Sequence, residues 1–197
     1  MSKISSHKVM TVSIIVSFFA ITILLLLSSN HNNYQSFAQN GNFSTYKNTT
    51  HGIEIQYPSD WVIMEQGKSP FVMSPDVITL LSPHNNNSSK TIPATFRVSV
   101  QNVNVTLDDY TNKTVGLIVE NTPGAKIIES SKTTLGGTPA HKVLGMFNQE
   151  GKDINVIDEW AIKNEQLYRI TFYSEQGSYS SYLPTVQKMI DSFVILK

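Results

Sequence analysis

The chain has 197 residues, of which 40% are apolar, and it carries 15 basic and 15 acidic side chains and no cysteine. That length supports one domain with a hydrophobic core rather than two full domains. The neutral charge balance excludes a strongly basic protein that holds nucleic acid through phosphate contacts. The lack of cysteine excludes disulfide frameworks, a cysteine nucleophile, thiolate zinc sites and iron–sulfur clusters.

An uncharged apolar segment lies close to the N-terminus and runs from Val9 to Leu27. At a helical rise of about 1.5 Å per residue, it spans roughly the 30 Å hydrocarbon core of a bilayer. Lys3 and Lys8 precede the segment and no basic residue follows it closely, which predicts a cytoplasmic N-terminus. We therefore expect residues 1–30 to be a signal peptide or signal anchor that places the rest of the chain on the extracytoplasmic side.

Two interpretations of this segment remain open. The small residues that end at Ala38 fit a signal peptide that is cleaved before Gln39, which would release a secreted protein. The apolar segment is longer than a usual signal-peptide core, and Ala38 lies far from its end, which favours an uncleaved single-pass anchor in the cell membrane. Under either interpretation, the polar, asparagine-rich residues 31–42 form a flexible tether and residues 43–197 form the exported domain.

Six asparagines are followed two residues later by serine or threonine, which is the pattern of N-glycosylation acceptors. They are Asn42, Asn48, Asn86, Asn87, Asn104 and Asn112. These acceptors fit a glycosylated surface protein, although an asparagine-rich composition accounts for them equally well.

From residue 43 onward, the pattern of apolar residues predicts mainly β-strands. Residues 53–57 (IEIQY) alternate apolar and polar side chains, as a strand with one buried face does. Two hairpins are predicted, one around Gly136 and Gly137 and the other around Asn164 and Glu165. The predicted strands are residues 43–46, 53–57, 61–64, 77–81, 95–100, 126–134, 140–147, 155–162 and 167–173.

Two amphipathic helices complete the predicted elements. The first begins after Thr106, which caps it, with Asp109 at the reciprocal capping position, and it ends before Pro123. The second carries apolar residues on one face near the C-terminus, and Pro184 is tolerable there only in the first turn. Because hairpins dominate and strands do not alternate with helices, we expect an antiparallel sheet covered by these helices, an α+β sandwich.

Several short motifs occur in an order and spacing that resemble the PsbP family over about residues 43–196. The resemblance implies a central antiparallel β-sheet flanked by helices on both faces, an α/β/α sandwich, and a non-enzymatic binding or assembly role. PsbP itself is the extrinsic subunit on the lumenal side of the oxygen-evolving photosystem. No metal ligand of the family matches a residue here, and the tether does not match the arm with which plant PsbP retains calcium and chloride. The motifs are Tyr46, Gly52-Ile53, YPSDW at 57–61, LDDY at 107–110, LGGTPA at 135–140, Leu167-Tyr168 and Ser192-Phe193.

Candidate metal ligands are few. Asp108 and Asp109 are adjacent carboxylates that could supply half of a calcium site, but such residues are also favoured at a helix N-terminus. His51, His84 and His141 lack the spacing of a zinc site, and we expect each to be exposed to solvent. We therefore expect no cofactor other than calcium.

No pattern of catalytic residues is recognisable in the sequence. A Gly-x-Ser-x-Gly nucleophile motif and a phosphate-binding glycine loop are both missing. Asp158 and Glu159 lie in a predicted strand near Asp153 and therefore point to opposite faces, so they cannot act as a close acid–base pair. Aromatic residues could line a ligand groove or form the core and its rim. These aromatic residues are Tyr57, Trp61, Tyr110, Trp160, Tyr168 and Tyr173.

Two functions follow as expectations. The first is a non-enzymatic, extracytoplasmic PsbP-like module that is tethered to the membrane through Val9 to Leu27 and docks on a membrane or surface protein complex. The alternative is a protein that binds a small ligand or a divalent cation of the calcium type.

Overall fold

The computed structural model describes residues 42–66, 75–83, 91–122 and 124–196. Within these ranges, no helix is both long enough and apolar enough to span a membrane. Several sequence predictions fall outside the described residues. They are the signal segment 1–30, the tether up to residue 41, the cleavage site at Ala38, and the side chains of His84, Asn86 and Asn87.

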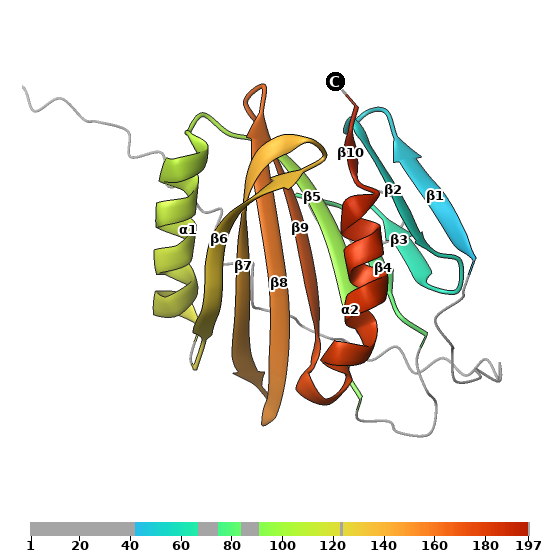
Figure 1. The fold of residues 1–197 in the computed structure, drawn as a ribbon, viewed down its shortest axis with the longest axis vertical. Coiled ribbons are helices and arrows are strands. Elements are labelled where there is room, and N and C mark those ends of the chain that lie inside the picture. The colour runs from blue at the N-terminus through green and yellow to red at the C-terminus, as the bar shows by residue number, and fades with distance from the viewer. Residues whose placement is uncertain (1–41, 67–74, 84–90, 123, 197) are drawn as a thin grey trace, which may run out of the picture.

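The described residues form ten strands and two helices (Figure 1). The strands are β1 (Phe43–Asn48), β2 (Ile53–Pro58), β3 (Val62–Glu65), β4 (Asp76–Leu81), β5 (Thr95–Asn102), β6 (Lys126–Leu135), β7 (Thr138–Gln149), β8 (Lys152–Lys163), β9 (Gln166–Glu175) and β10 (Val194–Ile195). The helices are α1 (Leu107–Asn121) and α2 (Gln176–Asp191).

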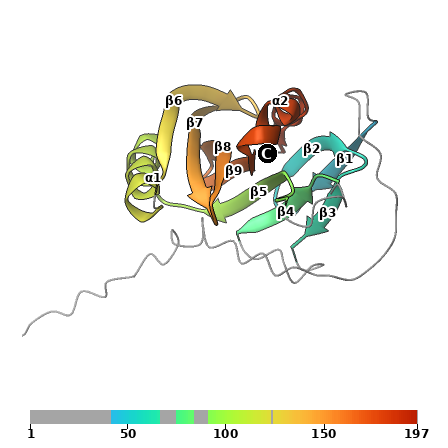
Figure 2. The ribbon, with the colours of Figure 1, turned by 90° about the horizontal axis from the view of Figure 1, so that it is seen from below.

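The strands form two antiparallel sheets. The larger sheet has seven strands in the order β3-β4-β5-β9-β8-β7-β6, and the smaller has three in the order β1-β2-β10. Helix α2 contacts β2 of the small sheet and both β8 and β9 of the large one, so it lies between the two sheets (Figure 1). The main hydrophobic core fills this region. Figure 2, viewed from below, shows how strongly the large sheet curves toward β6 and β7.

Local predictions of turns and caps are confirmed. Asn164 and Glu165 both adopt positive φ angles, of 51° and 60°, in the tight turn between β8 and β9. The hydroxyl oxygen of Thr106 accepts a hydrogen bond from the backbone amide of Asp109 at 3.1 Å, which caps α1. The alternating residues Ile53 and Ile55 of β2 are both fully buried. Each of these features is encoded by a few neighbouring residues.

The predicted α/β/α sandwich, with one central sheet flanked by helices on both faces, is wrong. The pairing is antiparallel as expected, but the fold is mostly β and contains two separate sheets. Two helices, of 15 and 16 residues, are too few to form layers over a seven-stranded sheet. Strands β1 and β2 do not join the large sheet, because β2 pairs with the two-residue strand β10 that follows α2. On the face of the large sheet next to α2, this single helix and the small sheet share the main hydrophobic core, so no helical layer forms there.

The position of Pro184 is a further correction. Helix α2 begins at Gln176, so Pro184 lies inside the helix and not in its first turn. Proline has no backbone N–H, so the helix lacks one of its internal hydrogen bonds at this position. The helix persists because its buried residues Val186, Met189 and Ile190 pack into the core between the sheets.

Candidate functional site

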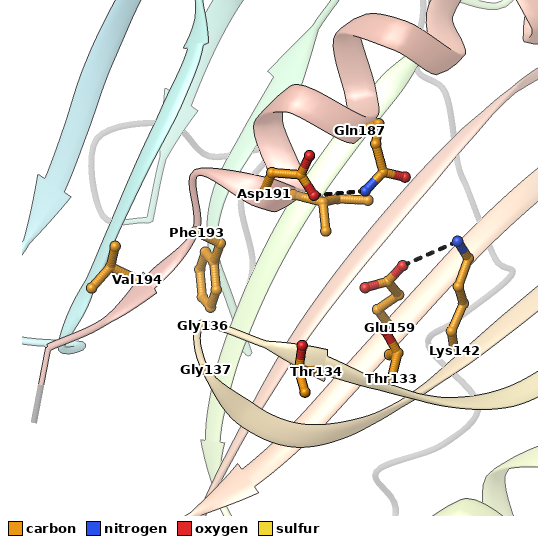
Figure 3. Close-up of a pocket in the computed structure, with 11 residues that line it drawn as sticks. Thr133, Thr134, Gly136, Gly137, Lys142, Glu159, Gln187, Asp191, Phe193 and Val194 are labelled. Atoms are coloured by element: carbon orange, nitrogen blue, oxygen red, sulfur yellow. Dashed lines mark hydrogen bonds and ion pairs between the residues drawn. The ribbon is translucent and has the colours of Figure 1, made fainter.

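A polar cavity of about 350 Å³ lies between the β6–β7 hairpin and the C-terminal end of α2. This volume is near the lower end of the roughly 300–1,000 Å³ of small-molecule pockets. Figure 3 shows its walls, in which a buried carboxylate faces a lysine across two strands. The lining residues are Thr133, Thr134, Gly136, Gly137, Lys142, Glu159, Gln187, Ile190, Asp191, Phe193 and Val194.

The base of the cavity holds a cross-strand ion pair. Lys142 on β7 and Glu159 on β8 are direct partners in the sheet register, so their side chains leave the same face. The lysine Nζ lies 3.6 Å from Oε1 of Glu159, whose side chain is only 3% exposed. Burial raises the pKa of Glu159, Lys142 partly offsets this effect, and the negative charges of Asp158 and Asp191 add to it.

The walls of the cavity come from a glycine turn and a helix end. Gly136 and Gly137 adopt positive φ angles of 55° and 73°, which ordinary side chains rarely allow. A Cβ atom on Gly136 would lie 3.0 Å from Cγ1 of Ile195, so the turn approaches β10 closely. On the other side, Asp191 in the last turn of α2 accepts a hydrogen bond from Nε2 of Gln187 at 2.8 Å. Both of these polar side chains are exposed, so they border the open side of the cavity.

A second polar cluster lies on the other face of β8, next to α1. Asp158 accepts a hydrogen bond from Nε of Arg169 at 2.7 Å, a second from the guanidinium, and a third from the Thr171 hydroxyl at 3.1 Å. Burial alone would lower the pKa of Arg169, but Asp158 and Tyr110 raise it above its ordinary value. The guanidinium also stacks 5.5 Å from the centre of the Trp160 ring. The charges of this cluster are paired, and the pocket next to it that Asp158 helps to line has a volume of only about 20 Å³.

The interpretation of Asp158 and Glu159 from strand geometry is confirmed. The two residues are consecutive in β8 and their ion pairs form with different partners, Arg169 and Lys142. They therefore do not share a site. Asp153, which is exposed on the same strand, accepts a hydrogen bond from Asn148 Nδ2 at 3.0 Å and joins neither pair.

Asp108 and Asp109 lie at the start of α1. The Asp109 carboxylate accepts a hydrogen bond from the Thr106 hydroxyl at 2.7 Å, consistent with a capping role. Among the described residues there is no group of three or more histidines or carboxylates placed to hold a metal ion. A calcium site at these two residues stays a prediction.

The two histidines within the described residues are half-buried and not freely exposed. His141 stacks on Trp160 with 5.5 Å between ring centres, and its Nε2 lies 2.8 Å from the Ser130 hydroxyl. Burial lowers its pKa. The backbone amide of His51 donates to Oδ1 of Asn48 at 3.0 Å, within the β1–β2 turn. Neither histidine lines the polar cavity.

The candidate aromatic residues form the core and its rim, which decides between the two interpretations of them. Trp61, Trp160, Tyr168 and Tyr173 are buried, and none of the six candidates lines the polar cavity. Trp160 is fully buried, and its indole N–H donates to the Thr111 hydroxyl at 2.9 Å. Tyr57 and Tyr110 are half-buried.

The candidate glycosylation sites differ in exposure. Asn42, Asn104 and Asn112 are exposed, as an acceptor asparagine must be, whereas Asn48 is half-buried. The side-chain amide of Asn48 donates to the Tyr46 hydroxyl at 3.0 Å, and its oxygen accepts from His51. Glycan at any of these positions stays a prediction.

Sequence reasoning missed the pairing of Lys142 with Glu159. The signal was present in the tight turn at Glu150 and Gly151, which joins β7 to β8 and was not predicted. Both turn residues adopt positive φ angles, of 52° and 80°. Lys142 lies as many residues before Glu150 as Glu159 lies after Gly151, so a two-residue turn at this point places them opposite each other.

A mostly β domain of two antiparallel sheets, with a polar cavity between the β6–β7 hairpin and the C-terminal end of α2, defines the class of this protein. The sequence profile of the family described as PsbP-like protein matches residues 8–195. The chain therefore belongs to the PsbP-like family. No curated protein sequence matches the chain at a significant level.

Solved structures share the fold at low sequence identity. Cyanobacterial PsbP (CyanoP) from Synechocystis sp. PCC 6803 is 12% identical with a TM-score of 0.57, covering 82% of this chain and 98% of its own. LpqN of Mycobacterium tuberculosis, described as involved in cell envelope biogenesis, is 16% identical with a TM-score of 0.59, covering 74% of this chain and 83% of its own. PA94 of Pseudomonas aeruginosa, a protein of unknown function, is 14% identical with a TM-score of 0.50, covering 75% and 93%. At these identities the likeness concerns the fold alone.

Proposed function

We propose that this chain is a non-enzymatic, extracytoplasmic PsbP-like module that is held at the membrane by residues 9–27 and docks on a membrane or surface protein complex. The observation that carries the proposal is the extent of the family match, from residue 8 to residue 195. The match includes the apolar segment together with the folded domain, which supports treating the two as parts of one tethered module. The positive-inside pattern supports an extracytoplasmic domain.

The geometry supports a binding role over a catalytic one. The two most deeply buried acidic residues of the described part of the chain, Asp158 and Glu159, occupy opposite faces of β8 and cannot exchange a proton between them. Asp158 is fixed by Arg169 and Thr171 inside the domain. This arrangement supports a rigid scaffold whose surface makes the functional contacts.

The membrane part of the proposal is tested by fractionation and labelling of cells that express the full chain. We expect the protein in the membrane fraction, with residues 43–197 accessible to an impermeant reagent added to intact cells. A variant with Phe18→Arg and Ile23→Arg places two charges in the apolar segment and should lose this location. Labelling of residues 43–197 only after lysis would contradict the proposal.

The docking part is tested by crosslinking in native membranes followed by mass spectrometry. We expect one protein to be recovered repeatedly and to be lost when the charged double variant no longer reaches the membrane. Recovery of unrelated neighbours in proportion to their abundance would contradict docking on a defined complex.

A second candidate function, binding of a small ligand or a divalent cation, is favoured by the polar cavity of about 350 Å³. A thermal melting panel of calcium, magnesium, amines and sugars tests it. A ligand present at about 100 times its dissociation constant should stabilise the fold by about 2.7 kcal/mol, a visible shift in melting temperature. A panel with no shift would exclude this second function.

A further inference from the structure

The polar cavity attracts positive charge. Glu159 at its base and Asp191 at its mouth carry negative charge, and Lys142 carries the one positive charge among the lining residues. Asp191 lies in the last turn of α2, where the partial charge of the helix end is also negative. The basic residue of the same turn, Lys188, is not among the lining residues, and its ammonium lies 3.9 Å from the centre of the Phe43 ring. Asp191 therefore adds to the negative field of the helix end on the side of the cavity.

The carboxylate at the base is incompletely paired. Its distance of 3.6 Å from the Lys142 ammonium is longer than the roughly 2.7–2.9 Å of a charge-assisted hydrogen bond. A carboxylate has about four acceptor positions, and the contact with Lys142, at Oε1, leaves most of them available. Only 3% of the Glu159 side chain is exposed, so bulk water solvates the carboxylate little. A cationic group that enters the cavity would supply the donors that this carboxylate can still accept.

We propose that the cavity binds a small organic cation, a molecule that carries a primary ammonium or guanidinium group together with hydroxyl or amide groups. The cationic group contacts Glu159 at the base and Asp191 at the mouth. The hydroxyls of Thr133 and Thr134 and the amide of Gln187 provide donors and acceptors for the uncharged part of the ligand. This proposal rests on the second candidate function, ligand binding, and not on docking or membrane attachment.

Other ligand classes fit the cavity less well. Calcium takes about six to eight oxygen ligands, and the described residues offer no cluster of three or more carboxylates or histidines. The Lys142 ammonium, next to the only buried carboxylate of the cavity, also repels a divalent ion more strongly than a monovalent one. An anion would meet two carboxylates and a helix C-terminus. An apolar ligand would strip water from polar walls without replacing its hydrogen bonds.

Calorimetry on the full chain in detergent micelles tests the proposal with paired probes of nearly equal size. Glucosamine is compared with glucose, and methylguanidinium with methylurea, so that each pair differs mainly in positive charge. Calcium chloride is the inorganic control. We expect each cation to bind at least about tenfold more tightly than its neutral partner, because a hydrogen bond to a charged group is lost in the neutral compound.

Three variants locate the site. Glu159→Gln and Asp191→Asn each remove one negative charge from the cavity and should each weaken binding of the cation by about tenfold. Asp153→Asn makes the same change on the exposed part of β8, outside the cavity, and should leave affinity unchanged. Asp191 is exposed, so its variant stays informative even if Glu159→Gln unfolds. Amide NMR shifts on addition of glucosamine should centre on Gly136 and Gly137 in the cavity wall.

The outcomes separate this inference from the function on which it rests. Equal affinity for a cation and its neutral partner, unchanged affinity in both cavity variants, or NMR shifts remote from the glycine turn would each overturn the organic-cation site. Binding of calcium or glucose alone would also overturn it while leaving the second candidate function in place. Absence of binding by every probe would overturn both.

Discussion

Asp158 and Glu159 are neighbours on β8, and they are equally buried but differ in the groups that surround them. Asp158 receives hydrogen bonds from Arg169 and Thr171 on the face next to α1. Glu159 has one lysine, Lys142, at 3.6 Å on the face next to α2. Both side chains are almost fully buried. Burial alone therefore does not distinguish a structural charge from a binding charge; the number of donors around it does.

The difference arises from what covers each face. Next to α1, Trp160 and Tyr110 pack edge to face with ring centres 5.9 Å apart. Arg169 lies over the Trp160 ring and donates to the Tyr110 hydroxyl at 3.3 Å. Next to α2, the cover consists of a glycine turn and the end of a helix, which leave a cavity. Next to Asp158 the large side chains leave only about 20 Å³, whereas the lack of side chains at Gly136 and Gly137 leaves about 350 Å³ next to Glu159.

The largest expected effect comes from breaking the Asp158 cluster. Arg169→Met leaves the Asp158 carboxylate buried without its cation, and loss of one partner from a buried pair costs about 3–5 kcal/mol. The free energy of unfolding, measured with urea by circular dichroism, should fall by this amount. The double variant Asp158→Leu, Arg169→Met removes both charges and should recover much of the loss. A fall below about 1 kcal/mol for Arg169→Met would mean that this pair is not structural.

A smaller effect is expected at the wall of the cavity, where two adjacent glycines form a matched pair. Gly137→Ala places a side chain at a φ angle of 73° with no atom within 4 Å, so it reports backbone strain alone, about 1–2 kcal/mol. Gly136→Ala adds a close approach, because its Cβ would lie 3.0 Å from Cγ1 of Ile195 and 3.1 Å from its backbone nitrogen. Overpacking of this kind typically costs about 1–3 kcal/mol more. Equal losses in the two variants, measured by urea unfolding, would show that the turn does not press on β10.

Features set by neighbouring residues could be predicted from the sequence, and features set by distant partners could not. The cap at Thr106 and the turn at Asn164 depend on a few adjacent side chains, and both were predicted. Strand β10 contains two residues, Val194 and Ile195, which are too few for any periodic pattern. Its pairing with β2 is a contact between the two ends of the domain, and this pairing creates the second sheet that the α/β/α prediction lacked.

The cavity could not be predicted either, because its walls come from segments that are far apart in the sequence. Its base depends on the register of β7 with β8, which the turn at Glu150 and Gly151 could have indicated. Its mouth depends on the position of α2 and on where this helix ends. The sequence placed the helix poorly, because Pro184 was assigned to the first turn and the helix in fact begins at Gln176. An empty volume between a hairpin and a helix end has no local sequence pattern. The exclusion of an acid–base pair at Asp158 and Glu159, in contrast, needed only the alternation of a strand.

The smallest effect on stability, and the sharpest contrast with Arg169→Met, is expected from Glu159→Gln. The glutamine keeps the shape of the side chain, and the Lys142 ammonium is 24% exposed and can still reach water, so the loss at neutral pH should stay within about 1 kcal/mol. The pH dependence carries more information. Burial, together with Asp158 and Asp191, raises the pKa of Glu159 above its ordinary 4.5, although Lys142 offsets part of the rise.

A raised carboxyl pKa means that the folded chain binds this proton more tightly than the unfolded chain does. Its stabilising contribution is complete below pH 4.5 and is lost as the pH rises through the higher folded-state pKa. Glu159→Gln lacks this titration, so its free energy of unfolding should decline less than that of the wild type over the same interval. Urea unfolding at a series of pH values between about 4 and 8 measures both curves, across the range in which raised carboxyl groups titrate. The pair of Asp158 with Arg169 is the same in both proteins. Two parallel curves would therefore mean that Glu159 titrates like a solvated carboxylate. That result would contradict the difference proposed between the two faces of β8.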